Sequence, residues 1–168
     1  MRKYSLFFLI ILFSENIFSQ TIQSDIADSV ITKFECKKLY KIIDAARNKF
    51  KGIRGARKNL KYSEVYAATV VPKGVKSAQI MIDGKSALYS ATLINTANRI
   101  EAGKMYGKFL PIIENCLEGW IFETELENEE QLFRFKAHEK EDMISGISVE
   151  VLLYRKGNRY IVDLYIQP

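Results

Sequence analysis

The stretch at residues 98–119, NRIEAGKMYGKFLPIIENCLEG, decides how the rest of the chain is arranged. Its apolar residues recur every three or four positions, which is the spacing of one face of an α-helix. Asn98 followed by Glu101 is typical of a capped helix N-terminus, and Gly119 stands where helices commonly end. The stretch therefore predicts a core helix, whose apolar face consists of Ala102, Met105, Phe109, Ile112, Ile113 and Cys116.

Pro111 lies inside this predicted helix. Proline has no backbone N–H to donate, and its ring clashes with the carbonyl four residues earlier, which here belongs to Gly107. A glycine at that position eases a local distortion of the backbone. The sequence therefore predicts a kink at this point, or a helix built of two pieces.

A second amphipathic helix is predicted earlier in the chain, at residues 35–52. Thr32 and Glu35 have the spacing of a capping box, and Gly52 is the expected end. The residues that follow, up to Lys61, are rich in Lys and Arg and are expected to form a basic loop. The apolar face of this helix consists of Cys36, Leu39, Ile43, Ala46 and Phe50.

Seven strands are predicted from apolar alternation and turn residues. Asp83-Gly84 is a strong hairpin signal between two of them, and the last segment alternates as a strand with one buried face does. Strands follow both predicted helices, so the two halves suggest a diverged repeat in element order only. The segments are 64–71, 78–82, 86–94, 120–126, 131–138, 147–154 and 159–166.

The expected fold class is α+β, an antiparallel sheet with two helices packed on one face, in the order helix, three strands, helix, four strands. The length of 168 residues suits one domain, and a chain that is 48% hydrophobic can bury a core of ordinary size. Small secretion chaperones, cystatin-like folds and NTF2-like folds have comparable layouts. This is an analogy of fold and implies no function.

The beginning of the chain, MRKYSLFFLIILFSENIFSQ, has the pattern of a secretory signal peptide. Two basic residues precede a short apolar run, and the small residue Ser19 precedes the expected cleavage site. The run is too short to span a bilayer, and no later stretch is apolar for long enough to do so. We therefore expect residues 1–19 to be removed, residues 20–168 to form a single α+β domain, and the protein to be secreted or periplasmic.

Cys36 and Cys116 are the two cysteines, and both lie in the part expected to be exported. An oxidising compartment favours a disulfide between such a pair. Cys36 falls in the first turn of one predicted helix and Cys116 in the last turn of the other. Helices packed antiparallel on one sheet face would bring these turns together, so a Cys36–Cys116 disulfide is predicted, with two buried free thiols as the alternative.

Reactive groups do not converge anywhere in the sequence. The single histidine, His138, lies at the end of a predicted strand among charged residues and is expected to be solvated. Glu123, Glu125 and Glu127 alternate along one strand and could serve a hydrolase, although a solvated sheet face is the simpler interpretation. No glycine pattern has the form of a phosphate-binding loop, and neither a cofactor nor a metal is expected.

Charge is unevenly placed along the chain. Residues 33–61 carry eleven Lys and Arg against two acidic residues, and residues 118–142 carry nine acidic residues against three Lys and Arg. The two regions attract each other, or are merely solvated, or the basic one is a binding face. The residues expected to form that face are Lys37, Lys38, Lys41, Arg54 and Arg57.

Nucleic acid is not an expected partner. Loss of Arg2, Lys3 and Glu15 with the signal peptide would leave 23 basic and 19 acidic residues, a modest net charge of +4. Aromatic residues also do not interleave with the basic run as a nucleic-acid platform requires. An acidic protein or an anionic envelope surface is the expected partner.

A small exported binding or accessory protein without catalysis is the leading hypothesis for the function. Two alternatives stay open. One is a hydrolase that uses Glu123 and Glu125. The other is a carrier of an apolar ligand, held between the sheet and the kinked helix in a cavity that Tyr106, Phe109 and Trp120 could line.

Overall fold

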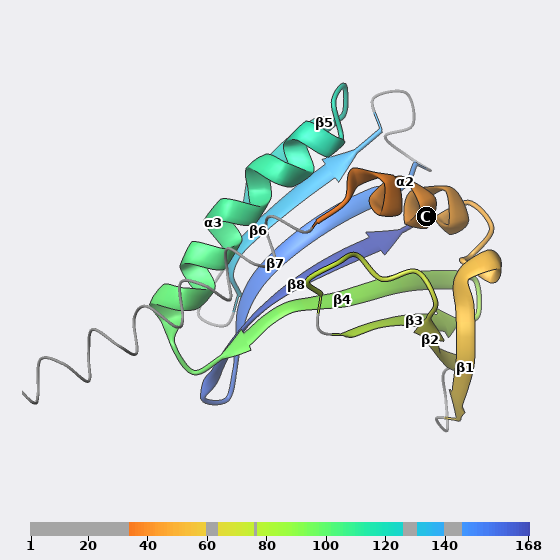
Figure 1. Ribbon diagram of the computed structural model, residues 1–168, viewed down its shortest axis with the longest axis horizontal. Helices are drawn as coiled ribbons and strands as arrows, with labels where there is room; N and C mark the ends of the chain where they lie inside the picture. The colour runs from red at the N-terminus through yellow and green to blue at the C-terminus, as the bar shows by residue number, and fades with distance from the viewer. Residues whose placement is uncertain (1–33, 60–63, 76, 126–130, 140–145) are drawn as a thin grey trace, which may run out of the picture.

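A computed structural model describes residues 34–59, 64–75, 77–125, 131–139 and 146–168 (Figure 1). The predicted signal peptide, Thr32 and Glu127 lie outside the described residues, so what the sequence predicts of them stays a prediction. The described chain folds into two α-helices and one eight-stranded antiparallel sheet. This confirms the α+β class.

One helix followed by four strands occurs twice along the chain. The strand order in the sheet is β1-β2-β3-β4-β8-β7-β6-β5, so each half forms a meander and the two meanders meet at β4 and β8. A short 3-10 turn, Lys51–Ile53, precedes β1. The bounds are α2 Cys36–Ala46, β1 Arg54–Asn59, β2 Glu64–Ala68, β3 Ser77–Asp83, β4 Ser86–Thr96, α3 Arg99–Cys116, β5 Ile121–Glu125, β6 Gln131–His138, β7 Ser148–Lys156 and β8 Arg159–Gln167.

The first strand replaces the basic loop that the sequence predicts, so that prediction and the expected count of three strands are wrong. Among the described strands, β1 lies at one edge of the sheet and pairs with β2 alone. An edge strand needs no apolar alternation, and charged side chains are common there because they discourage pairing with other chains. Gly55 allows the close approach of the two strands, since a Cβ there would lie 3.0 Å from the Ala67 carbonyl oxygen.

Alternate residues of the central strands face one core that both helices share. On β8 these residues are Val162, Leu164 and Ile166, which are all fully buried, as the alternation in the sequence predicts. Burial of each such side chain contributes about 1.5–3 kcal/mol. Both helices contact β4 and β8, and in Figure 1 α3 lies beside β6 and β7 while α2 lies next to the C-terminal end of β8. The helices therefore cover the core-facing side of the sheet.

The N-terminus of α3 is capped as predicted, with one difference. The Asn98 side-chain oxygen accepts hydrogen bonds from the backbone N–H groups of Ile100 and Glu101, at 2.9 and 3.3 Å. Glu101 does not bond back to the Asn98 backbone as in a capping box. Its carboxylate accepts a hydrogen bond from the Thr96 hydroxyl, whose oxygen accepts from the Asn98 N–H at 3.1 Å.

α3 runs as one helix past Pro111, so the alternative of a helix in two pieces is wrong. Its buried face matches the predicted one except that Ile112 is only half-buried and Tyr106 is buried in addition. Gly119 follows in the turn after the helix with a φ of +87°, a conformation that few other residues adopt. This residue ends the helical path as expected.

α2 differs from its prediction at both ends. It begins directly after Glu35, whose side chain makes no capping hydrogen bond and instead pairs with Lys73 at 2.9 Å, so the role predicted for Glu35 in a capping box is wrong, while the role predicted for Thr32 lies outside the described residues. The helix ends at Ala46, because Lys49 and Phe50 have positive φ values of 50° and 61° and turn the chain. This turn places the fully buried ring of Phe50 in the core.

The predicted disulfide between Cys36 and Cys116 is confirmed, with the two Cα atoms 5.3 Å apart. It joins the first turn of α2 to the last turn of α3. The antiparallel packing expected of the helices is wrong, because in Figure 1 α2 continues beyond the end of α3 and does not turn back along it. The Tyr40 hydroxyl, which donates to the Cys116 carbonyl, is a second link at this junction.

Removal of the disulfide should lower the free energy of unfolding substantially. The cysteines are 80 residues apart, and a loop of that length corresponds to about 4.5 kcal/mol in the chain-entropy model, an upper figure because the unfolded chain retains some structure. Urea unfolding of the Cys36→Ala/Cys116→Ala variant measures the loss, and the reduced wild-type protein is the matched control. Two reactive thiols per chain in the denatured, unreduced protein would contradict the bond itself.

Candidate functional site

The face of the sheet that points away from the helices, here called the outer face, carries buried polar side chains. Ser90, His138, Ser148 and Asp163 are each at most 9% exposed. Each lies at a position that alternates with the core-facing residues of its strand. The sequence predicts a single buried face for the last strand, and that is wrong, because Asp163 and its outer-face neighbour Ile161 are buried too.

Asp163 is the centre of a hydrogen-bonded cluster on the outer face. The hydroxyls of Tyr154 on β7 and Tyr165 on β8 both donate to its Oδ2 atom, at 2.8 and 3.0 Å. Its Oδ1 atom is buried and has no hydrogen-bond partner in the part of the chain that the structure describes. A buried acceptor without a partner is costly, so the cluster is a polar site built at the expense of stability. The available signal in the sequence was an Asp in the middle of an otherwise apolar strand.

The two tyrosines of this cluster have perturbed pKa values. Burial raises the pKa of Tyr154 to about 12, and the negative charge of Asp163 acts in the same direction. Burial and the same carboxylate also raise the pKa of Tyr165. Both groups therefore remain neutral hydrogen-bond donors at any physiological pH.

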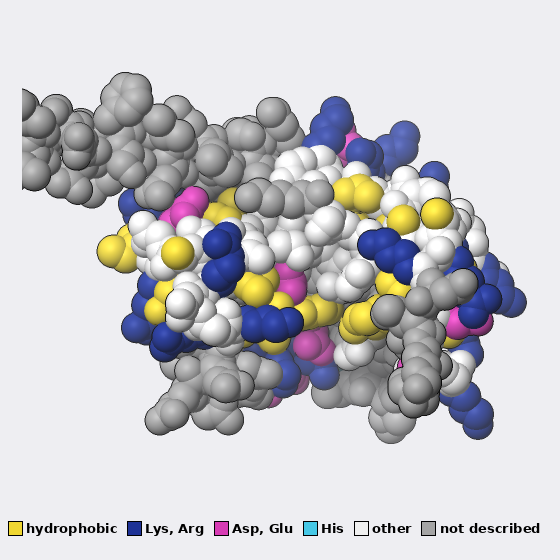
Figure 2. Space-filling view, turned by 90° about the horizontal axis from the view of Figure 1, so that it is seen from below, with side chains coloured by type: hydrophobic (Ala, Val, Ile, Leu, Met, Phe, Trp, Pro, Cys, Tyr) yellow, Lys and Arg dark blue, Asp and Glu magenta, His cyan; other side chains and the backbone are white. Residues whose placement is uncertain are grey.

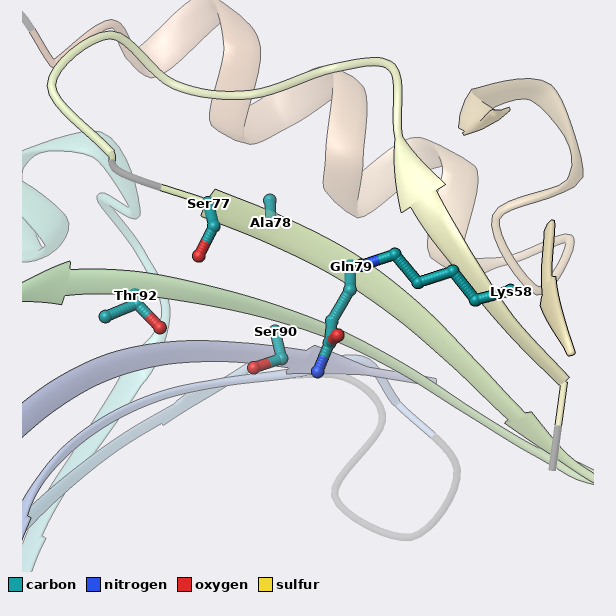
Figure 3. A pocket seen from close by; sticks show the side chains of 6 residues that line it. All are labelled: Lys58, Ser77, Ala78, Gln79, Ser90 and Thr92. Carbon is teal, nitrogen blue, oxygen red and sulfur yellow. The ribbon is translucent and has the colours of Figure 1, made fainter. Parts of the chain in front are cut away.

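A hollow of about 170 Å³ lies on the outer face next to the Asp163 cluster. Figure 3 shows Ser77, Gln79, Ser90 and Thr92 projecting on the side of the sheet away from α2. Thr92 is paired directly with Asp163 in the register of β4 and β8, which places the hollow beside the cluster. The complete lining is Lys58, Ser77, Ala78, Gln79, Ser90 and Thr92.

The three lysines of the predicted basic face all lie on α2. Lys37 and Lys41 are exposed one helical turn apart. Lys38 is half-buried, and its Nζ atom donates to the Val71 carbonyl at 3.0 Å. In the view of Figure 2, Lys and Arg side chains are spread over the molecule with acidic side chains among them.

The two arginines of the predicted basic face are held by contacts within the chain. Arg54 donates to the Lys49 carbonyl through Nη2 at 2.6 Å, and its guanidinium lies over the ring of Tyr66. Arg57 pairs with Glu64 at 2.9 Å. The structure therefore leaves Lys37 and Lys41 as the most available members of the predicted face.

The residues of the predicted apolar cavity are packed against other rings. Phe109 is fully buried and meets Phe34 edge to face, with the ring centres 4.9 Å apart. Tyr106 packs against Phe133 at 5.7 Å, and Trp120 lies partly buried against the core. The carrier hypothesis rests on a space between these side chains, and it stays a prediction.

The carboxylates of the predicted hydrolase site lie on β5 at the other edge of the sheet. Glu123 and Glu125 are exposed, and Glu125 pairs with Arg134 at 3.4 Å. Unlike these two carboxylates, His138 is not exposed to solvent. The prediction of an exposed histidine is wrong. His138 is the last residue of β6, and its side chain lies on the outer face, where it is 8% exposed and opposite Ser148.

No family model, no curated protein and no solved structure matches this chain. Among the described residues, no three or more His, Cys, Asp or Glu side chains gather as a metal site would require. Within the same residues no helix is both long enough and apolar enough to cross a membrane.

The free energy of unfolding should fall as the pH rises from about 10 to about 12. Raised pKa values of Tyr154, Tyr165 and Tyr106 mean that the folded state favours their neutral forms, so this stability is fully present below the unfolded pKa near 10 and is lost above it. Asp163→Asn removes the charge beside two of these groups and should make the fall shallower. Urea unfolding across this pH range is the measurement, with exposed Asp44→Asn as the control. Equal falls in both variants would contradict the assigned cause.

The lysines of α2 should differ in their contribution to stability. Lys37→Glu with Lys41→Glu should change the free energy of unfolding by no more than about 0.5 kcal/mol, because both side chains are exposed. Addition of Lys38→Glu should lower the free energy of unfolding by a further ~1–2 kcal/mol. It removes the hydrogen bond to the Val71 carbonyl and places a carboxylate near Glu35. Chemical unfolding compares the two variants. A double variant that fails to fold would mean that the orientation of α2 is wrong.

Proposed function

We propose that the protein is a small exported binding protein without catalysis, and that its partner carries negative charge. The Cys36–Cys116 disulfide supports export, because such bonds persist in oxidising compartments and are rare in the cytosol. The predicted signal peptide at residues 1–19, a single domain at residues 20–168 and a secreted or periplasmic location are parts of the same proposal.

The proposal of an anionic partner rests on two residues, Lys37 and Lys41. Both are exposed on the same side of α2, and neither has an ion-pair partner among the described residues. Most charges in a folded protein that have no partner are merely solvated, but two such lysines one turn apart form a local positive field. An anionic envelope surface is the simplest partner for that field, and an acidic protein is the other one.

The experiment measures binding to vesicles that contain phosphatidylglycerol, to uncharged phosphatidylcholine vesicles and to polyglutamate. Each lysine near an anionic membrane contributes about 1 kcal/mol, so Lys37→Glu with Lys41→Glu should weaken binding by at least ~10-fold. Binding should also weaken as salt is added. The matched control is Lys85→Glu with Lys156→Glu, of which the first is an exposed lysine in the turn between β3 and β4 and the second is the exposed last residue of β7.

Selective binding to the phosphatidylglycerol vesicles supports an envelope surface, and selective binding to polyglutamate supports an acidic protein. Equal loss in the α2 variant and in the control would show that only net charge matters and that α2 is not the binding face. No binding to either anionic probe overturns the proposal of an anionic partner.

A further inference from the structure

We infer that the hollow on the outer face binds a small carboxylic acid that also carries hydroxyl groups, with its carboxylate held by Lys58. This site is separate from the exposed lysines of α2, because its polar lining projects on the other side of the sheet (Figure 3). Binding at the hollow and binding at α2 can therefore be tested independently of each other.

The first observation is a positive charge that nothing in the described chain balances. β1 carries three cationic side chains, and two of them, Arg54 and Arg57, are held by the Lys49 carbonyl and by Glu64. Lys58 has no ion pair or hydrogen bond among the described residues. Figure 3 shows its side chain extending from β1 toward Gln79, over the hollow. Lys58 is exposed and solvated, and an anionic group in the hollow would replace part of that water with a charge-assisted hydrogen bond.

The second observation is the kind of group that lines the rest of the hollow. Ser77, Ser90 and Thr92 offer hydroxyls and Gln79 offers an amide, and each of these groups can both donate and accept a hydrogen bond. A ligand that presents several hydroxyls finds a partner for each of them there. An apolar ligand would leave these groups without partners, which is costly.

The third observation selects the type of anion. Asp163, paired in register with Thr92, places a buried negative charge directly beside the hollow. Like charges repel in proportion to their magnitude, and more strongly where water is excluded. A singly charged carboxylate is therefore favoured over a phosphate group that carries two charges.

Glucuronate and glucose form a matched pair of probes, because they share a ring and differ by one carboxylate. Titrations of the ¹⁵N-labelled protein should show glucuronate shifting the backbone amide signals of residues 77–79, 90 and 92. Glucose should bind at least ~10-fold more weakly, and so should inorganic phosphate. Lys58→Gln should weaken glucuronate binding by a similar factor. Exposed Lys85→Gln, in the turn between β3 and β4, is the control and should leave it unchanged.

Thr92→Val tests the hydroxyl lining separately, since it keeps the shape of the side chain and removes one hydrogen-bonding group. It should weaken glucuronate binding without changing the spectrum of the unbound protein beyond its neighbours. Glucose binding as tightly as glucuronate, tighter binding of phosphate, or an unaltered affinity in Lys58→Gln would each overturn the inference. The absence of any shift at about 50 mM glucuronate, far above the millimolar range of weak ligands, would overturn it as well.

Discussion

The pairing of β4 with β8 joins the two halves of the molecule, and the rest of the fold depends on it. Every other strand pair among the described residues lies within one half of the chain. The register sets Tyr89 opposite Ile166 and Ala91 opposite Leu164, so the two meanders present one continuous apolar surface to the helices. Because these partners are far apart in sequence, the chain must close a long loop before the contact stabilises it. The disulfide offsets part of this cost by joining the two helices across the same boundary.

Where a local rule determines an element, the sequence predicted it well. The cap of α3, the hairpin at Asp83-Gly84 and the core-facing residues of β8 depend on neighbouring residues and on alternation, and all three are confirmed. The disulfide was also predictable, because the chain has two cysteines, which allow one pairing, and both lie on the apolar face at the end of a helix. Its predicted cause was wrong nevertheless, since the helices meet end to end. A distance between two residues can thus be right while the packing that was to produce it is not.

The errors share a physical origin, because in each case a contact made on folding overrides the pattern of residue types within one segment. β1 has no apolar alternation and exists because β2 offers it a row of backbone hydrogen bonds. α2 stops early because the core takes the ring of Phe50. Asp163 and His138 are buried on a face that was expected to be solvated, and in the case of Asp163 two tyrosines reach across it. These contacts follow from strand pairing and from packing in the core, which the alternation of residue types along a single segment does not show.

The uneven charge of the chain takes on a different meaning once the strand order is known. The basic run includes β1 and the acidic run includes β5, and these strands form the two opposite edges of the sheet. Among the described residues the two regions meet through the ion pair of Arg47 and Glu139. Edges of like charge repel their own copies, which protects an open sheet from aggregation. Part of the asymmetry therefore has a structural cause at the edges, and the surfaces proposed for binding, the exposed side of α2 and the hollow beside Asp163, lie away from the acidic edge.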